Sequence, residues 1–200
     1  IHPLSVFMSK VKTTKIAEKE LDRIPGLLKL IEKRLDRFYA KHHKESTLLG
    51  YLDKPLLEED FSYVIPDFPN RDHWFQNRVL HELAIIKTSI VQEACNDDFK
   101  DFLLLAFSSI IVPVSNQDSE TRYAAIKKQI PRKHAFSLFK NKLRDMSARM
   151  REFNVQASDC TTQVHFDDCR KMDSLPENSV DLIVTSPPYP NTYDYYLYHK

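Results

Sequence analysis

Glycine is scarce in this chain, and the scarcity limits which nucleotide-binding turns the chain can build. The 200 residues include two glycines, Gly26 and Gly50, whereas an ordinary usage of about 7 per cent predicts roughly 14. Neither a G-x-G-x-x-G dinucleotide-binding motif nor a G-x-x-x-x-G-K-[ST] phosphate-binding loop occurs in the sequence. The chain therefore does not wrap a phosphate in a glycine-rich turn of its own.

The remaining composition is that of a globular protein with enough apolar residues for a core. Hydrophobic residues make up 42% of the chain and charged residues 28%. No apolar run approaches the roughly 20 residues that span a bilayer, and no signal peptide opens the chain, so we expect a cytoplasmic protein without a membrane segment. The spacing of Cys160, His165 and Cys169 matches no common zinc pattern, so we expect no metal site.

Positive charge is concentrated in one part of the chain. Residues 122–151 contain ten basic residues and one acidic residue, Asp145, although the formal net charge of the whole chain is +1. Either a solvated helix face or a surface that binds a phosphate backbone produces such a stretch. The candidate contacts to nucleic acid within it are Lys127, Lys128, Arg132 and Lys133.

Hydrophobic periodicity predicts a mostly helical chain up to about residue 158. Apolar residues recur at helical spacing over residues 4–12, 14–43, 74–95, 99–111 and 135–153. Pro25-Gly26 is expected to break or restart the second of these helices, and Asp97 or Asp98 to cap the fourth. Residues 45–72 and 114–132 are expected to be irregular because they are rich in proline and turn-forming residues.

The pattern changes near residue 160, where two β-strands are predicted. Residues 163–166 form a short candidate strand. Residues 180–185, with the sequence V-D-L-I-V-T, have a nearly continuous apolar run typical of a buried parallel strand.

The sequence Ser186-Pro187-Pro188-Tyr189 directly follows the second predicted strand. It resembles the catalytic motif of DNA amino-methyltransferases, which methylate the exocyclic amine of cytosine or adenine. The resemblance implies an α/β, Rossmann-like fold that uses S-adenosylmethionine and carries a large helical insertion. It places the start of this fold at residues 1–12, the insertion at 13–158, and core strands with the catalytic loop at 159–200.

The residue types in this motif suit methyl transfer to an aromatic amine. The lone pair of such an amine is delocalised into the ring, so two hydrogen-bond acceptors are needed to hold its hydrogens and favour a tetrahedral nitrogen. The Ser186 hydroxyl and the Pro187 carbonyl are these acceptors, and Pro188 fixes the backbone direction. Tyr189 offers a ring on which an extruded base stacks.

The resemblance extends to three residues on the methyl-donor side. Asp168, within Asp167-Asp168-Cys169-Arg170, corresponds to the acid that contacts the adenine of the donor, and Cys169 lies beside it. The family usually has glycine where Asp167 stands. Ile1, within Ile1-His2-Pro3, corresponds to a residue that packs on the same adenine. We therefore expect a fragment whose glycine-rich donor loop precedes residue 1, and which by itself binds the donor poorly and is inactive.

Residues after the catalytic motif continue the resemblance and are candidates for the base pocket: Asn191, Tyr193, Asp194 and Tyr195. The pairs Trp74-Phe75 and Ser115-Asn116 also resemble recurring features of the same subgroup. The expected partners are double-stranded DNA and a cognate restriction endonuclease, and cytosine N4 is favoured over adenine N6. Alternatives are a helical DNA-binding or specificity module with a vestigial methyltransferase motif, and an enzyme that methylates an RNA base or protein glutamine.

Overall fold

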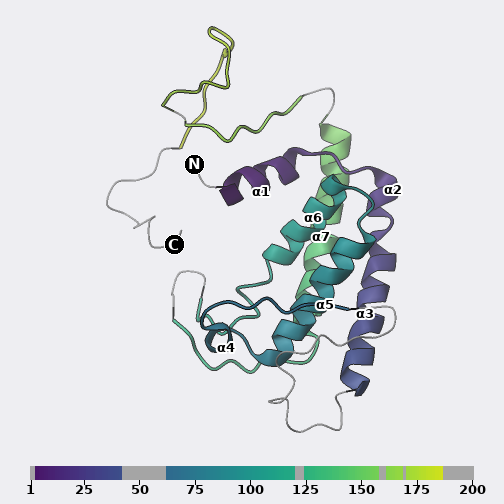
Figure 1. The fold of residues 1–200 in the computed structure, drawn as a ribbon. Helices are drawn as coiled ribbons and strands as arrows, with labels where there is room; N and C mark the ends of the chain where they lie inside the picture. The colour runs from purple at the N-terminus through teal and green to yellow at the C-terminus, as the bar shows by residue number, and fades with distance from the viewer. Residues whose placement is uncertain (1–2, 42–61, 120–123, 158–160, 169, 187–200) are drawn as a thin grey trace. The chain divides into compact units, whose positions relative to one another are not determined.

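The computed structural model describes residues 3–41, 62–119, 124–157, 161–168 and 170–186. The chain divides into two compact units, one comprising residues 2–164 and the other residues 165–200 together with residue 1. The larger unit contains seven helices among its described residues (Figure 1). They are α1 (Pro3–Thr13), α2 (Glu18–Leu21), α3 (Ile24–Lys41), α4 (Arg71–Trp74), α5 (Asn77–Glu93), α6 (Asp97–Ser108) and α7 (His134–Gln156).

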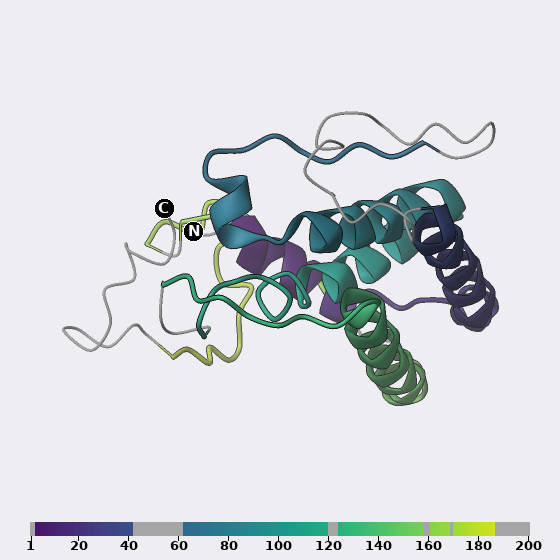
Figure 2. The same ribbon diagram turned by 90° about the horizontal axis from the view of Figure 1, so that it is seen from below.

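Helix α5 lies at the centre of the larger unit. It packs against α3, α6 and α7, while α6 also packs against α1 and α7. Figure 2 shows α3 and α7 at one side of this bundle. The core is apolar and includes the fully buried Ile31, Ile86, Leu103 and Phe139, one from each of four helices. Amphipathic helices with such stripes gain most of their stability from this packing.

Local sequence explains where several helices begin. Pro25 occupies the first turn of α3, where its missing N–H costs no hydrogen bond, and Asp22 and Arg23 separate α3 from α2. Asn96 caps α6, because its Oδ1 accepts a hydrogen bond from the Phe99 N–H at 2.8 Å. The predicted cap at Asp97 or Asp98 is therefore wrong by one residue or two, although the helix itself is confirmed.

The predicted α/β fold is wrong for the described residues, which are helical and contain no β-strand. Their β-type pairing consists of one isolated antiparallel bridge between Gln117 and Ala125. Residues 163–166 and 180–185 have no regular secondary structure and no strand partners. A strand needs neighbouring strands for its backbone hydrogen bonds and a covered face for its apolar side chains. Leu182 and Val184 have neither, and are 80% and 87% exposed.

Candidate functional site

The predicted catalytic motif is described only at its first residue. Ser186 is exposed and follows the segment 180–185, which has no regular secondary structure. Pro187, Pro188 and Tyr189 lie outside the described residues, as do Asn191, Tyr193, Asp194 and Tyr195 of the predicted base pocket. The arrangement of these residues around a base therefore stays a prediction.

Asp168, the predicted contact for the donor adenine, lies in a turn of the smaller unit. Both of its carboxylate oxygens accept hydrogen bonds from Arg170, at 3.0 Å from Nε to Oδ1 and 2.6 Å from Nη2 to Oδ2. The Arg170 guanidinium holds the pKa of this carboxyl below its usual value. This pairing defines the conformation of Asp168 in the structure, and its contact with a donor adenine stays a prediction. Ile1 and Cys169 lie outside the described residues.

Asp167 organises the same turn from the position where the resembling family usually has glycine. Its carboxylate accepts hydrogen bonds from the backbone N–H groups of Asp168 at 2.7 Å and Ser174 at 2.9 Å. The bonding to Ser174, followed by that to the Asp168 N–H, keeps the pKa of Asp167 low. Left-handed backbone occurs instead at Met172 and Asn178 (φ 50° and 58°). The Asx-type hydrogen bond of this turn is made by Asp168, whose Oδ1 accepts from the Arg170 N–H at 3.0 Å, and the turn does not use a glycine.

The four basic residues predicted to contact nucleic acid lie just before α7 and have different surroundings. Lys127 is exposed and Lys128 is half-buried, with its carbonyl accepting a hydrogen bond from Gln76 Nε2 at 2.7 Å. Arg132 is exposed, and its guanidinium carbon lies 5.4 Å from the centre of the Tyr39 ring. Lys133 forms an ion pair with Asp36 of α3.

A buried carboxylate, which sequence reasoning missed, fixes the start of α7. Glu82 of α5 accepts hydrogen bonds from the backbone N–H groups of Lys133 at 2.7 Å and Ala135 at 3.2 Å. It also accepts one from the Tyr39 hydroxyl. Burial, and then the hydrogen bond to Glu82, raises the pKa of Tyr39. A carboxylate at a helix N-terminus satisfies unpaired N–H groups and interacts favourably with the helix dipole.

One signal for this role was present in the sequence. Glu82 interrupts the apolar stripe of α5 between Val79 and Leu83, and an acidic residue at such a position must find hydrogen-bond donors when the helix is buried. The neighbouring Arg78 donates a hydrogen bond to the Ile130 carbonyl. Together these contacts hold the basic segment against α5.

The two residue pairs noted in the sequence meet in the structure. The Asn116 N–H donates to the Trp74 carbonyl at 2.7 Å, and the Asn116 side-chain amide donates to the His73 carbonyl at 3.0 Å. Phe75 packs edge-on against Phe68, with ring centres 6.1 Å apart. These contacts connect α4 to the segment after α6. Packing and backbone hydrogen bonding therefore account for the two residue pairs.

The described part of the chain lacks two other kinds of feature. It contains no group of three His, Cys, Asp or Glu side chains arranged to hold a metal ion. None of its helices combines the length and the apolar character needed to cross a membrane.

The chain is similar to a known methyltransferase. It is 30% identical over 200 aligned positions to the type II methyltransferase M.MvaI of Kocuria varians, and the match covers 94% of this chain. The chain spans 40% of that relative's length. No family model matches the chain, and no solved structure matches it. The similarity supports the predicted relationship to methyltransferases.

Proposed function

We propose that this chain is part of a DNA amino-methyltransferase that uses S-adenosylmethionine, with cytosine N4 favoured over adenine N6. The observation that carries the proposal is Ser186-Pro187-Pro188-Tyr189 in a chain that is 30% identical to a type II methyltransferase. The relative's class also suggests a restriction endonuclease as functional partner and the cytoplasm as location.

The reacting amine is held by this chain's own residues in the proposed mechanism. The Ser186 hydroxyl oxygen and the Pro187 carbonyl oxygen accept hydrogen bonds from its two N–H groups. These bonds favour a tetrahedral nitrogen with an available lone pair. The base is extruded from the duplex and stacks on Tyr189. Asn191, Tyr193, Asp194 and Tyr195 shape its pocket. S-adenosylmethionine, when bound, supplies the methyl group, and fixed dipoles stabilise the charge that develops on the amine.

Two further groups of residues have proposed binding roles. Ile1, Asp168 and Cys169 are proposed to lie on the donor side, and in this proposal Asp168 exchanges its pairing with Arg170 for the donor's adenine amine. Lys127, Lys128, Arg132 and Lys133 are proposed to contact DNA phosphates. Lys127 and Arg132 are exposed, as such contacts require.

A methylation assay on the full-length protein tests the catalytic assignment. Unmethylated duplex DNA is incubated with S-adenosylmethionine, and the modified nucleoside is identified by mass spectrometry. Ser186→Ala is expected to lower the rate about 100-fold or more, the usual cost of removing one placed polar group from an active site. Ser179→Ala is the matched control, because the Ser179 hydroxyl bonds only to the nearby Pro176 carbonyl among the contacts described.

The possible results separate the alternatives. Methylation that survives Ser186→Ala shows that the catalytic assignment is wrong. A wild-type protein that binds DNA without methylating it supports the helical DNA-binding module. Methylation of RNA but not of DNA supports the RNA-base alternative.

A further inference from the structure

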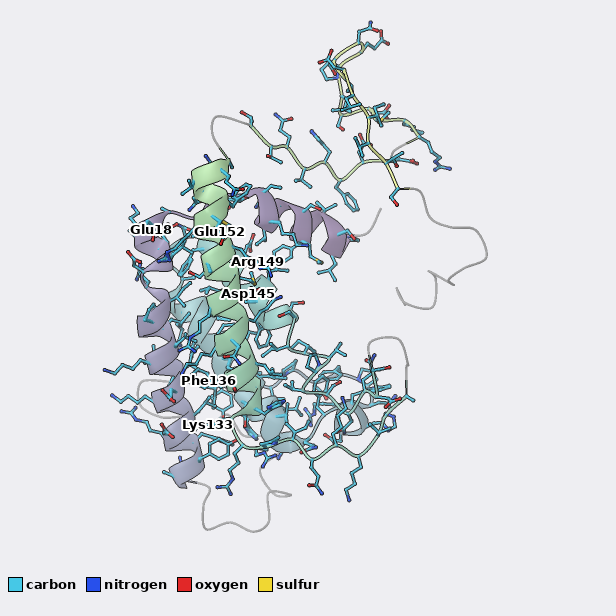
Figure 3. All side chains as sticks on the ribbon, turned by 180° about the vertical axis from the view of Figure 1, so that it is seen from behind. Glu18, Lys133, Phe136, Asp145, Arg149 and Glu152 are labelled. Carbon is cyan, nitrogen blue, oxygen red and sulfur yellow. The ribbon has the colours of Figure 1, made fainter. Side chains whose placement is uncertain are left out.

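A hollow of about 540 Å³ lies between α3 and α7 in the larger unit. Its lining includes the apolar side chains of Leu28, Phe136 and Ala148. Four basic side chains also line it, Lys29 from α3 and Lys140, Arg144 and Arg151 from α7. Figure 3 shows α7 beside α3, with Phe136 near the start of α7 and Arg149 near its end. The hollow thus combines apolar surface with positive charge.

The positive charge follows one flank of α7. Lys133, Lys140, Arg144 and Arg151 are separated by seven, four and seven residues, so they lie on the same side of the helix. The first and last of them pair with acids: Lys133 with Asp36, and Arg151 with Glu18 at 2.6 Å and Asp22 at 2.7 Å. These pairs fix the flank toward α2 and α3.

The middle of the flank is not neutralised in this way. Within the described part of the chain, no carboxylate forms an ion pair with Lys140, Arg144 or Lys29. Lys140 Nζ lies 6.0 Å from the centre of the Phe136 ring, a weak cation–π contact. The lining contains two acids, Asp22, which is paired with Arg151, and Glu32. The hollow therefore keeps an excess of positive charge.

We propose that this hollow binds the phosphodiester backbone of double-stranded DNA, an inference that rests on the proposed function. Its three unpaired basic groups are complementary to phosphates, and the apolar surface between them suits the deoxyribose. The flank from Lys133 to Arg151 is about 27 Å long at 1.5 Å per residue. That length equals roughly eight base pairs at 3.4 Å each.

Salt-dependent DNA binding by the full-length protein tests the surface. The triple variant Lys29→Gln/Lys140→Gln/Arg144→Gln is compared with Lys12→Gln/Lys142→Gln/Arg149→Gln. The control removes the same number of lysines and arginines from a second groove, which lies between α1, α6 and α7. Affinity for a short labelled duplex is measured by fluorescence anisotropy between about 50 and 200 mM salt.

The proposal predicts different results for the two triple variants. Each lost phosphate contact makes the slope of log affinity against log salt less negative by about 0.9. We therefore expect a change of about 2 to 3 for the hollow variant and less than about 1 for the control. Equal changes in both variants, or no change in either, would overturn the proposal.

Glu32→Gln provides a test that loss of folding cannot mimic. It removes the acid of the hollow that has no ion pair within the described residues, so affinity is expected to rise about two- to fivefold at low salt. Unchanged or weaker binding by Glu32→Gln would contradict the proposed surface. If the protein never methylates DNA but the hollow variant binds DNA more weakly than the wild type, the proposed surface is supported and the methyltransferase proposal is rejected. If the wild-type protein methylates DNA and the hollow variant binds DNA as tightly as the wild type, only the proposed surface is rejected.

Discussion

Glu82 is a charged residue in an apolar environment. It lies in the apolar face of α5 and is 1% exposed, yet burial of a carboxylate is costly unless hydrogen bonds compensate it. The backbone N–H groups of Lys133 and Ala135 and the Tyr39 hydroxyl supply these bonds. The residue therefore connects α5 to the start of α7 and to α3.

Replacing Glu82 with glutamine should destabilise the larger unit. Glutamine has nearly the same shape, but its amide NH₂ would face an N–H or O–H donor in place of a carboxylate oxygen. We expect Glu82→Gln to lower the free energy of unfolding by about 2 to 3 kcal/mol, the range for a buried polar group that loses its partner. Urea denaturation measures this change.

Glu93→Gln is the matched control for this substitution. Glu93 is exposed at the end of the same helix, so its replacement should change stability by less than about 0.5 kcal/mol. If the two variants unfold at the same urea concentration, Glu82 does not have the connecting role described here.

The helices were largely predictable because each carries its own periodic pattern. The expected helix over residues 135–153 is observed as α7, and that over 99–111 as α6. The helix expected over 74–95 is observed as α5 together with the separate short helix α4. The break between α4 and α5 was missed, because Trp74 and Phe75 continue the apolar pattern while the backbone at Phe75 is extended.

Contacts between helices were not predictable, because they join residues far apart in the sequence. The ion pair of Lys133 with Asp36 connects α7 to α3, and that of Arg151 with Asp22 connects α7 to the segment before α3. Charge counting left two interpretations of the stretch 122–151, a solvated helix face and a phosphate-binding surface. The structure shows that Lys133 and Arg151, the first and last basic residues of the α7 flank, pair with acids.

The attachment of α3 to α7 should weaken at alkaline pH. The pKa of Tyr39 in the folded chain lies above its ordinary value of 10.0. Above that value the unfolded chain loses the Tyr39 proton before the folded chain does, so stability falls as pH rises. Tyr39→Phe lacks this proton. Wild-type stability should therefore fall more steeply than that of Tyr39→Phe between about pH 9 and 11.

Thermal or urea unfolding of both proteins across this range measures the difference. Their stabilities at pH 7 serve as the reference for each curve. Parallel curves for the two proteins would show that the Tyr39 proton is not coupled to folding.

At the scale of the whole molecule, the fold class was mispredicted because a strand depends on partners that its own sequence does not contain. The V-D-L-I-V-T run has the composition of a buried strand, yet residues 180–185 are exposed and have no regular secondary structure. The motif that follows them was identified from residue types alone, and its geometry beyond Ser186 lies outside the described residues. Similarity to a methyltransferase supports its interpretation at the level of enzyme class.

The larger unit should fold without the smaller one. Its buried apolar cluster extends from Val11 to Met150, and no described residue beyond 164 belongs to it. A fragment of residues 2–164 should therefore keep the helical circular dichroism of the 200-residue chain and unfold cooperatively at nearly the same temperature.

A fragment of residues 14–164 is the control, because it lacks α1 and with it the buried Val11. It should melt several degrees lower, since about 1 kcal/mol shifts the midpoint by roughly 2 to 4 °C in a unit of this size. If residues 2–164 alone are unfolded or melt well below the whole chain, residues 165–200 contribute to the core and the division into two units is wrong.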